Sequence, residues 1–419
     1  MSDTLPFTLG ITYRQRRSGH AMWQQFDHGA AREELAQIAA LGIGSVRLPL
    51  TWAEFQPRAD RVGSRAMQVL EQTLDMAGAC GLQALPVLLP VADGGALQIP
   101  GWANGPDVLG QLRRARGGRA TLMMRPPGAI SVLAGERYVP IQCGDLFTDE
   151  DLLAAQLLLV REVAGYFGSH PAIWGWQIGA GLERATSPLQ AADVTRWCTA
   201  LTDTLHQVAP AARALGVVSR HGLSRAAGPH PADLGGCADL GVSVDPAEEQ
   251  PAQVRRLTDP AAFLHALAAG LAGRAVHVID AGLALATDGA PRGWGIVSAY
   301  GSTTAVYLAD AVEQGEYTAA LLDRLYAAGA AGIWLAGYAD HPAETWRAAP
   351  LDRASGHRAL GLVDAQGNEK PAAAAVRAFA TRLASAPATR PAPPTLDAER
   401  HRHDAARETT RLWREFVAP

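Results

Sequence analysis

The stretch His170–Arg184, with the sequence HPAIWGWQIGAGLER, carries the strongest signal for the fold. After the loop residue Pro171, residues 173–178 alternate aromatic and smaller side chains at the two-residue period of a pleated strand. The strand then runs into Gly179–Gly181, where side chains are nearly absent, and the next ionisable group is Glu183. A short strand that ends in an open turn between helical stretches is typical of one wall of a (β/α)8 barrel.

Seven further strands alternate with helices along the chain. The pattern predicts strands at Leu9–Tyr13, Ser45–Leu50, Leu82–Leu89, Ile173–Ile178, Ala214–Val218, Asp239–Val244, Ala275–Ile279 and Gly332–Leu335. It predicts helices at Gly29–Leu41, Ser64–Ala79, Thr148–Phe167, Val194–Ala209, Pro260–Ala272, Glu316–Ala328 and Pro371–Leu383. Eight strands alternating with helices indicate an α/β chain built as one (β/α)8 TIM barrel.

We expect the barrel to occupy residues 1–384. Within it, the Gly- and Pro-rich segment 91–140 forms a long loop after the third strand, and a loop of this length favours a shielding arm over the barrel mouth. Residues 385–395 are Pro-rich and predict a stiff linker. Residues 396–419 predict a C-terminal helix that docks on the barrel through Leu412, Trp413 and Phe416.

The composition excludes several classes of function. The net charge of −4, without runs of Lys or Arg, argues against a nucleic-acid partner. The absence of an apolar run of about 18–20 residues and of a signal peptide argues against membrane insertion, and we expect a cytoplasmic protein. No phosphate-binding loop, metal-binding helix or nucleotide fingerprint is present, so we expect no cofactor and no metal. The four cysteines lack metal-ligand or disulfide spacing and predict buried thiols: Cys80, Cys143, Cys198 and Cys237.

With the strands placed, the chain resembles the retaining clan A glycoside hydrolases, in particular the family 5 barrels of the cellulase and β-mannanase type. The resemblance runs from about Leu9 to Phe379 and is carried by GITYRQRR with WQQFD, ELAQIAALGIGSVRLPLTWAEFQP, HPAIWGWQIG and GLVDAQGNEKPAAAAVRAF. It implies hydrolysis of β-glycosidic bonds by two glutamates, an acid/base after strand four and a nucleophile after strand seven. In retaining enzymes these carboxyl groups lie about 5–5.5 Å apart.

Both glutamates of that pattern are replaced here. Gly181 stands where the resemblance places the acid/base, and Asp280 stands at the nucleophile position with a side chain one methylene shorter. Other departures affect the residues around the pair: Ala180 for an Asn, Val244 and Pro246 for a His and a Tyr, and Ala336 for an aromatic platform. Arg47 on strand two matches the family pattern.

Tryptophans near the catalytic mouth favour a carbohydrate-binding groove, with core packing as the alternative. They are Trp23, Trp52, Trp102, Trp174, Trp294 and Trp346. Trp334 lies two residues before Ala336, on the same face of strand eight. We expect Arg47, Trp52, Trp102 and Trp334 to contact a β-linked oligosaccharide, and the sequence identifies no protein partner.

Three functions remain open. The favoured one is a pseudoenzyme, a glycosidase-like barrel that has lost catalysis and retains a carbohydrate-binding or partner-binding role. The second is an active, rewired β-glycosidase with Asp280 as nucleophile and Glu183 as acid/base, which requires the loop to fold inward around Gly181; otherwise Glu183 faces solvent or caps a helix. The third is a different reaction that uses Glu54, Asp93 or Asp340.

Overall fold

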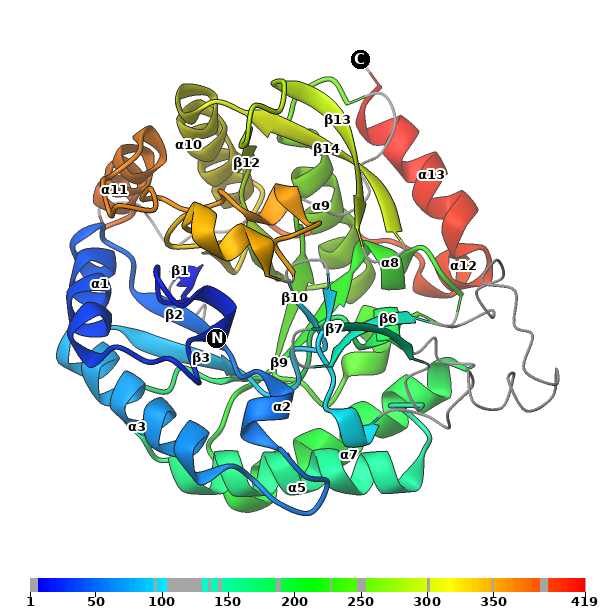
Figure 1. The fold of residues 1–419 in the computed structure, drawn as a ribbon. Coiled ribbons are helices and arrows are strands. Elements are labelled where there is room, and N and C mark those ends of the chain that lie inside the picture. Colours follow the sequence, from blue (N-terminus) through cyan, green and yellow to red (C-terminus); the bar gives the residue numbers. More distant parts are fainter. Residues whose placement is uncertain are drawn as a thin grey trace, which may run out of the picture.

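The computed structural model describes residues 7–93, 96–103, 130–134, 137–141, 145–185, 190–226, 228–246, 254–299, 302–348, 350–384 and 391–418. Eight parallel strands close into a barrel in the order β1-β15-β11-β10-β9-β8-β3-β2, and helices surround it (Figure 1). The predicted (β/α)8 architecture is therefore confirmed.

All eight predicted barrel strands are present. They are β1 (Thr8–Thr12), β2 (Ser45–Pro49), β3 (Gln83–Val87), β8 (Trp176–Gln177), β9 (Ala214–Ser219), β10 (Asp239–Ser243), β11 (His277–Ala281) and β15 (Gly332–Leu335). The fourth strand is shorter than expected. Ile173 forms only an isolated bridge, to Ala84 of β3, and the hydrogen-bond partner of the chain changes before β8 begins. The N–H of Trp174 donates to Ala84 on one side, whereas that of Trp176 donates to Arg213 on the other.

The outer helices also follow the sequence pattern. The long ones are α1 (His28–Ala40), α3 (Ser64–Ala79), α5 (Glu150–Phe167), α7 (Ala191–Val208), α9 (Asp259–Ala272), α10 (Ala311–Ala327) and α11 (Pro371–Leu383). Aspartates cap three of them, since Asp27, Asp149 and Asp310 accept backbone N–H groups in the first turn. Short helices follow three strands at the mouth: α2 (Trp52–Phe55), α6 (Leu182–Ala185) and α8 (Arg220–Leu223).

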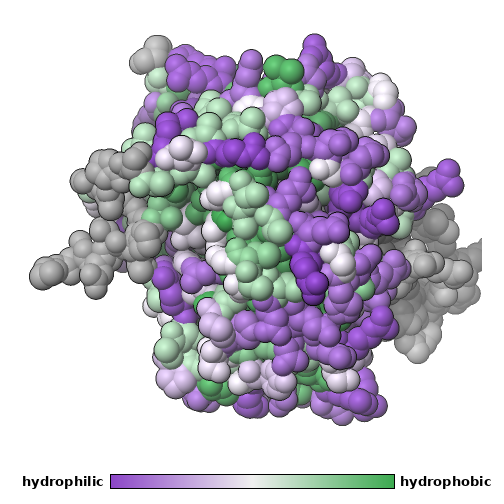
Figure 2. All heavy atoms as spheres, turned by 90° about the vertical axis from the view of Figure 1, so that its left-hand side faces the viewer, coloured by the Kyte–Doolittle hydropathy of each residue, from purple (hydrophilic) through white to green (hydrophobic). Residues whose placement is uncertain are grey.

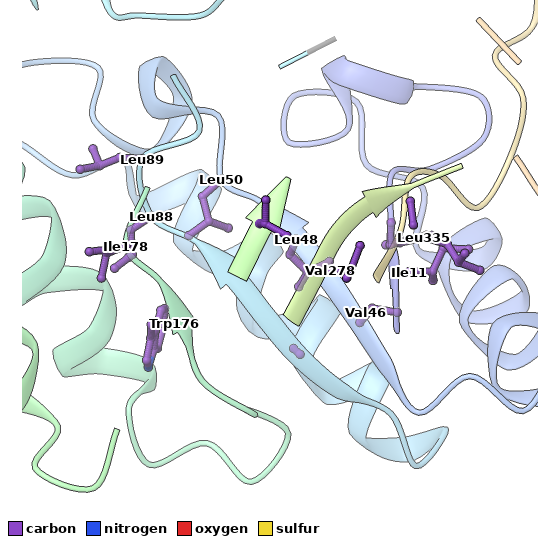
Figure 3. Packing of buried hydrophobic residues seen from close by; sticks show 14 of the residues in the cluster. Ile11, Val46, Leu48, Leu50, Leu88, Leu89, Trp176, Ile178, Val278 and Leu335 are labelled. Carbon is purple, nitrogen blue, oxygen red and sulfur yellow. The ribbon is translucent and has the colours of Figure 1, made fainter. Parts of the chain in front are cut away.

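Apolar side chains fill both faces of the barrel wall. Strand residues such as Val46, Leu48 and Val278 belong to the large buried cluster of the fold (Figure 3). A second cluster of Leu85, Leu215, Ile279 and Trp334 is made by other residues of the barrel strands.

Trp334 fills space that a neighbouring strand leaves empty. A side chain on Gly10 of β1 would lie 2.3 Å from the Trp334 indole, so the glycine makes room for the ring. The indole N–H donates to Ser45 Oγ at 3.3 Å. Because barrel interiors are packed in layers rather than hollow, Trp334 is a core residue at 0% exposure.

Two sheets outside the barrel were not expected from the sequence. The segment 91–140, predicted as a loop, contains β4 (Ala92–Asp93), β5 (Ala96–Leu97), β6 (Ile130–Ala134) and β7 (Arg137–Ile141), while residues 104–129 of the expected arm lie outside the described ranges. After β11, the chain forms β12 (Ala284–Leu285) and the antiparallel hairpin of β13 (Gly293–Ala299) and β14 (Ser302–Ala309). This hairpin lies at the same side of the barrel as α13 (Figure 1).

The C-terminal tail forms two helices, α12 (Ala398–His403) and α13 (Ala405–Phe416), in place of the single helix expected. The break falls at Asp404, whose side chain caps α13. Trp413 packs edge-on against Phe263 of α9 with ring centroids 5.2 Å apart, and Arg402 pairs with Asp233 at 2.9 Å. Of the expected linker, residues 385–390 lie outside the described ranges.

One face of the molecule carries both polar and apolar side chains. Figure 2 shows that the face on the left-hand side of Figure 1 is largely hydrophilic, with small apolar areas between the charged groups. Among the helices that the structure describes, none is both long enough and apolar enough to cross a membrane. The three described cysteines are free thiols, and Cys143 lies outside the described residues.

Candidate active site

A cavity of about 970 Å³, open to solvent, lies at the carboxyl ends of the barrel strands. Strand ends supply much of its lining, including Arg47, Gln177, Ser219, Ser243 and Asp280. This is the face at which (β/α)8 enzymes place their active sites. The cavity also brings together Asp280 and Glu183, two carboxyl groups that are 97 residues apart in the chain.

Arg47 organises the floor of this cavity. Its Nε donates to Gln177 Oε1 at 2.8 Å, and its Nη1 lies 2.8 Å from Asp280 Oδ1 and 3.2 Å from Thr12 Oγ1. The Arg47 side chain is only 6% exposed, so its charge depends on the Asp280 carboxylate for compensation. Gln177 is held in turn by a 2.8 Å hydrogen bond from its Nε2 to the carbonyl of Gly179.

The backbone of β11 is irregular at the point where it presents Asp280. The register against β15 shifts between Val278 and Ala281, and Asp280 has a φ of 60°, in the left-handed region. Such bulges re-aim side chains next to active sites, and left-handed backbone is retained at a cost of about 1–2 kcal/mol. The carboxylate is thereby directed to Arg47 on one oxygen and to the Ser243 hydroxyl, at 3.2 Å, on the other.

Glu183 lies in α6, immediately after the turn that ends β8. The turn contains Gly181 with a φ of 68°, which folds the chain inward. The Glu183 side chain is buried, lines the cavity and accepts a hydrogen bond from the Ser219 hydroxyl. Ser219 Oγ itself accepts the Gly222 N–H at 3.2 Å. The alternative in which Glu183 faces solvent is therefore wrong, whereas its place in the first turn of α6 agrees with the alternative of a position at a helix N-terminus.

Two serines connect the carboxyl groups across the wall of the barrel. Ser219 of β9 and Ser243 of β10 are paired in register, and each donates to one of the two acids. Neighbouring strands lie about 4.8 Å apart, so the two serines place the Glu183 and Asp280 carboxyl groups beside adjacent strands of the same wall.

The position that the resemblance assigns to the acid/base has no room for a side chain. A Cβ atom on Gly181 would lie 2.3 Å from the Cβ of Ala92. Ala92 is held there because the N–H groups of Val91 and Ala92 both donate to the Ala180 carbonyl, at 3.0 and 3.2 Å. The start of the segment 91–140 thus occupies the space next to the strand-four turn.

The structure does not bring the three expected sugar-binding tryptophans to the cavity. Trp52 is fully buried and donates to Gln56 Oε1, while Trp102 packs edge-on against Trp52 and donates to the Gln56 carbonyl. Trp334 is the core residue described above. Their positions follow from packing: each indole N–H has a partner inside the protein, away from the cavity lining.

Two of the three acids of the third hypothesis, Glu54 and Asp340, do not line the cavity. Asp340 is buried and accepts two hydrogen bonds from Lys370 Nζ, at 2.8 and 3.0 Å, which makes it half of an internal ion pair. Glu54 accepts a hydrogen bond from Gln24 and does not line the cavity. Asp93 is in β4, but its side chain lies outside the described part of the chain.

Several polar residues at the mouth were missed by the sequence reasoning. Arg14, Arg184 and Asp245 line the cavity together with His20 and His357. The Oδ2 atom of Asp245 lies 3.7 Å from His357 Nε2. Their place in the sequence could have identified two of them, because Arg14 and Asp245 each follow closely after a barrel strand and therefore lie at the carboxyl ends of the strands. No cluster of metal-ligating side chains occurs among the described residues.

Comparisons with known proteins place this geometry in context. No protein-family model and no curated protein matches the sequence. Among solved structures, the GH5_18 protein from Streptomyces cattleya, in complex with GlcNAc, superposes with a TM-score of 0.71 at 20% identity, over 93% of this chain and 83% of that one. The chain shares the (β/α)8 fold of that structure.

Two further structures agree with this fold. A single-substitution variant of the Streptomyces cattleya protein, in complex with Manβ1-4GlcNAc, gives a TM-score of 0.68 at 20% identity over 92% of this chain and 83% of that one. The exo-β-1,4-mannosidase Op5Man5 from Opitutaceae bacterium strain TAV5 gives 0.67 at 20% identity, over 90% of this chain and 59% of that one. At this identity the likeness establishes the barrel architecture.

Proposed function

We propose that the chain binds a β-linked saccharide in the barrel mouth and hydrolyses it with Asp280 as nucleophile and Glu183 as acid/base. The observation that carries this proposal is that both carboxyl groups line one open cavity at the carboxyl ends of the strands. The sequence favoured loss of catalysis because Gly181 is not ionisable. The inward position of Glu183 supports the rewired pair instead.

Asp280 has the surroundings that a nucleophile needs. Arg47 and Ser243 fix the two carboxylate oxygens, so that the side chain is oriented before substrate arrives. The side chain is 25% exposed, which leaves it accessible from the cavity. The register shift in β11 offers a physical reason why the shorter side chain of an aspartate suffices at this position.

The proposed reaction has two steps. Asp280 attacks the anomeric carbon while the glycosidic C–O bond breaks, and the carboxylic acid proton of Glu183 passes to the leaving oxygen. Water then attacks the same carbon, releases Asp280 and gives its proton to Glu183. A positioned acid/base of this kind contributes about 10²–10⁴-fold in rate.

The sugar class is proposed from the structural neighbours. Their structures contain GlcNAc and Manβ1-4GlcNAc, and one of them is named an exo-β-1,4-mannosidase. We therefore propose β-mannosides as the first substrates to test, followed by β-glucosides.

A second candidate function is saccharide binding without turnover. It is favoured by the filled space at Gly181, where the resemblance places the acid/base. Under this function the mouth holds a sugar, and Glu183 serves only as a hydrogen-bond acceptor.

Turnover of aryl β-glycosides and β-1,4-linked manno- and gluco-oligosaccharides separates the two functions. Asp280→Asn and Glu183→Gln preserve side-chain shape, and each is expected to lower the rate at least about 10²-fold. Asp288→Asn is the matched control, because Asp288 also has a positive φ, of 57°, but does not line the cavity.

The leaving group distinguishes the roles of the two acids. A dinitrophenyl leaving group needs no proton, so Glu183→Gln should lose less activity on it than on an alkyl glycoside, whereas Asp280→Asn should lose activity on both. NMR of the first-formed anomer should show retention. Binding without turnover would establish the second candidate, and neither binding nor turnover would overturn both.

A further inference from the structure

A second, shallow hollow opens beside the first, between the hairpin β13–β14 and the outer helices α9 and α10, and its volume of about 540 Å³ includes space open to solvent. Trp294 and Tyr307 line it from the hairpin, and Tyr317 lines it from α10. Asp245, after β10, lines both this cavity and the barrel mouth. The two cavities therefore share a wall at the catalytic face of the barrel.

The hairpin presents an aromatic corner to this space. Trp294 and Tyr307 are directly opposite each other in the antiparallel register, with ring centroids 5.5 Å apart at an interplanar angle of 79°. Trp294 is 49% exposed, one of the largest exposed apolar side chains among the described residues. Pyranose rings bind to such indoles through their C–H faces, because an aromatic ring offers apolar area with little conformational freedom to lose.

Polar groups accompany the aromatic corner. Tyr317 makes no hydrogen bond with any described residue, and burial raises the pKa of its hydroxyl, which keeps it protonated as a donor. Arg220 and Asp245 add charged groups at the edge of the same cavity. A few polar groups around an apolar surface are typical of a site that fixes the orientation of a small polar ligand.

Two sequence departures help to shape this space. Val244 and Pro246 stand where the resemblance places a His and a Tyr, and both line the second cavity. The hairpin between β11 and α10 supplies the opposite wall.

We propose that this second cavity, the hairpin subsite, binds a further pyranose of the saccharide held in the barrel mouth, with Trp294 as the stacking platform. The proposal rests on the proposed function, because it extends the ligand from the mouth past Asp245. It makes Trp294 a determinant of specificity for oligosaccharides over monosaccharides.

The test is calorimetric titration with methyl β-mannoside, β-1,4-mannobiose and β-1,4-mannotriose, and with the matching β-1,4-gluco series, with Glu183→Gln present in every variant compared so that hydrolysis does not contribute to the heat. Trp294→Ala should weaken binding of the longer ligands about threefold to tenfold and leave monosaccharide binding unchanged. Tyr317→Phe should weaken the longer ligands in the same direction. Ile296→Ala is the matched control, because Ile296 is 72% exposed on the same face of β13 and does not line the cavity.

The outcomes separate this inference from the proposed function. Monosaccharide binding with no gain from chain length, or an equal loss in Ile296→Ala, would overturn the hairpin subsite alone. No binding of any saccharide by the unmodified protein would overturn both proposals. A length-dependent gain that is lost in Trp294→Ala, but kept in Ile296→Ala, would establish the hairpin subsite.

Discussion

Placing a glutamate at position 181, as the family pattern suggests, should damage the protein without creating an acid/base. Gly181 has a φ of 68°, and a Cβ atom there would lie 2.3 Å from the Cβ of Ala92. Any side chain at this position must therefore strain the backbone and displace the segment that begins at Val91.

The magnitude follows from those two effects. Left-handed backbone costs a non-glycine residue about 1–2 kcal/mol, and forcing an extra carbon into packed structure costs about 1–3 kcal/mol. We expect Gly181→Ala to lower the free energy of unfolding by about 2–5 kcal/mol. For a chain of this length, that loss lowers the melting temperature by roughly 2–6 °C.

A second glycine separates the two costs. Gly81 has a similar φ of 72°, but no atom lies within 4 Å of a Cβ atom built on it. Gly81→Ala should therefore show the backbone cost alone, about 1–2 kcal/mol. Combining Gly181→Ala with Ala92→Gly should restore the share of the unfolding free energy that was lost to the contact with Ala92. The double variant is compared with each single variant in a double-mutant cycle.

Thermal unfolding followed by circular dichroism measures these differences in stability. The turnover of aryl glycosides by Gly181→Glu is measured beside that of the unmodified protein. Equal destabilisation by Gly81→Ala and Gly181→Ala would show that Ala92 does not fill the position. A rate for Gly181→Glu above that of the unmodified protein would refute the assignment of Glu183 as acid/base.

Three other substitutions test separate parts of the argument. Trp334→Ala should lower the free energy of unfolding by about 3–5 kcal/mol while saccharide affinity in calorimetry stays unchanged, because the indole is core; a weakened affinity would place it in the site. Asp340→Ala should cost about 3–5 kcal/mol because it leaves the buried Lys370 ammonium unpaired, and adding Lys370→Met should recover most of that loss in denaturant titrations with turnover unaffected. Burial lowers the pKa of His230 from 6.5 to about 3. Between these pH values the imidazole is protonated in the unfolded chain and neutral in the folded one, so stability is lost as the pH falls from about 6.5 toward 3. His230→Asn, which keeps an acceptor for the Ala232 N–H, should flatten that slope in unfolding measured at pH 4 to 7, and an unchanged slope would assign it to other groups.

The barrel could be predicted from the sequence because its signals are local. Alternating apolar residues indicate which segments are strands, and the 3.6-residue period indicates the helices, so that the approximate bounds predicted for α3 and α11 agree with the observed ones. The order of eight strands with helices between them then leaves one closed architecture. The hairpin β13–β14 escaped this reasoning because Gly293 and Gly295 interrupt the apolar alternation in its first strand.

The site was determined only in part by the same reasoning. The position of Asp280 at the end of strand seven, and of Arg47 on strand two, follows from strand boundaries, whereas the ion pair between them is a contact that only the structure shows. The direction of Glu183 did not follow, because it depends on Ser219, 36 residues further along, and on the turn at Gly181. The interior position of Trp334 likewise depends on Gly10, at the other end of the chain.

By itself, then, the amino-acid sequence determined the barrel, the face at which the strand-end side chains gather and, to within about two residues, where each strand ends. These depend on periodicity and on residues close together in the chain. Only the tertiary structure decided which side chains meet in the mouth, that Ala92 fills the space beside Gly181, and that Trp294 borders a second cavity. Each of these is a contact between segments far apart in sequence, and its geometry exists only once the barrel has closed.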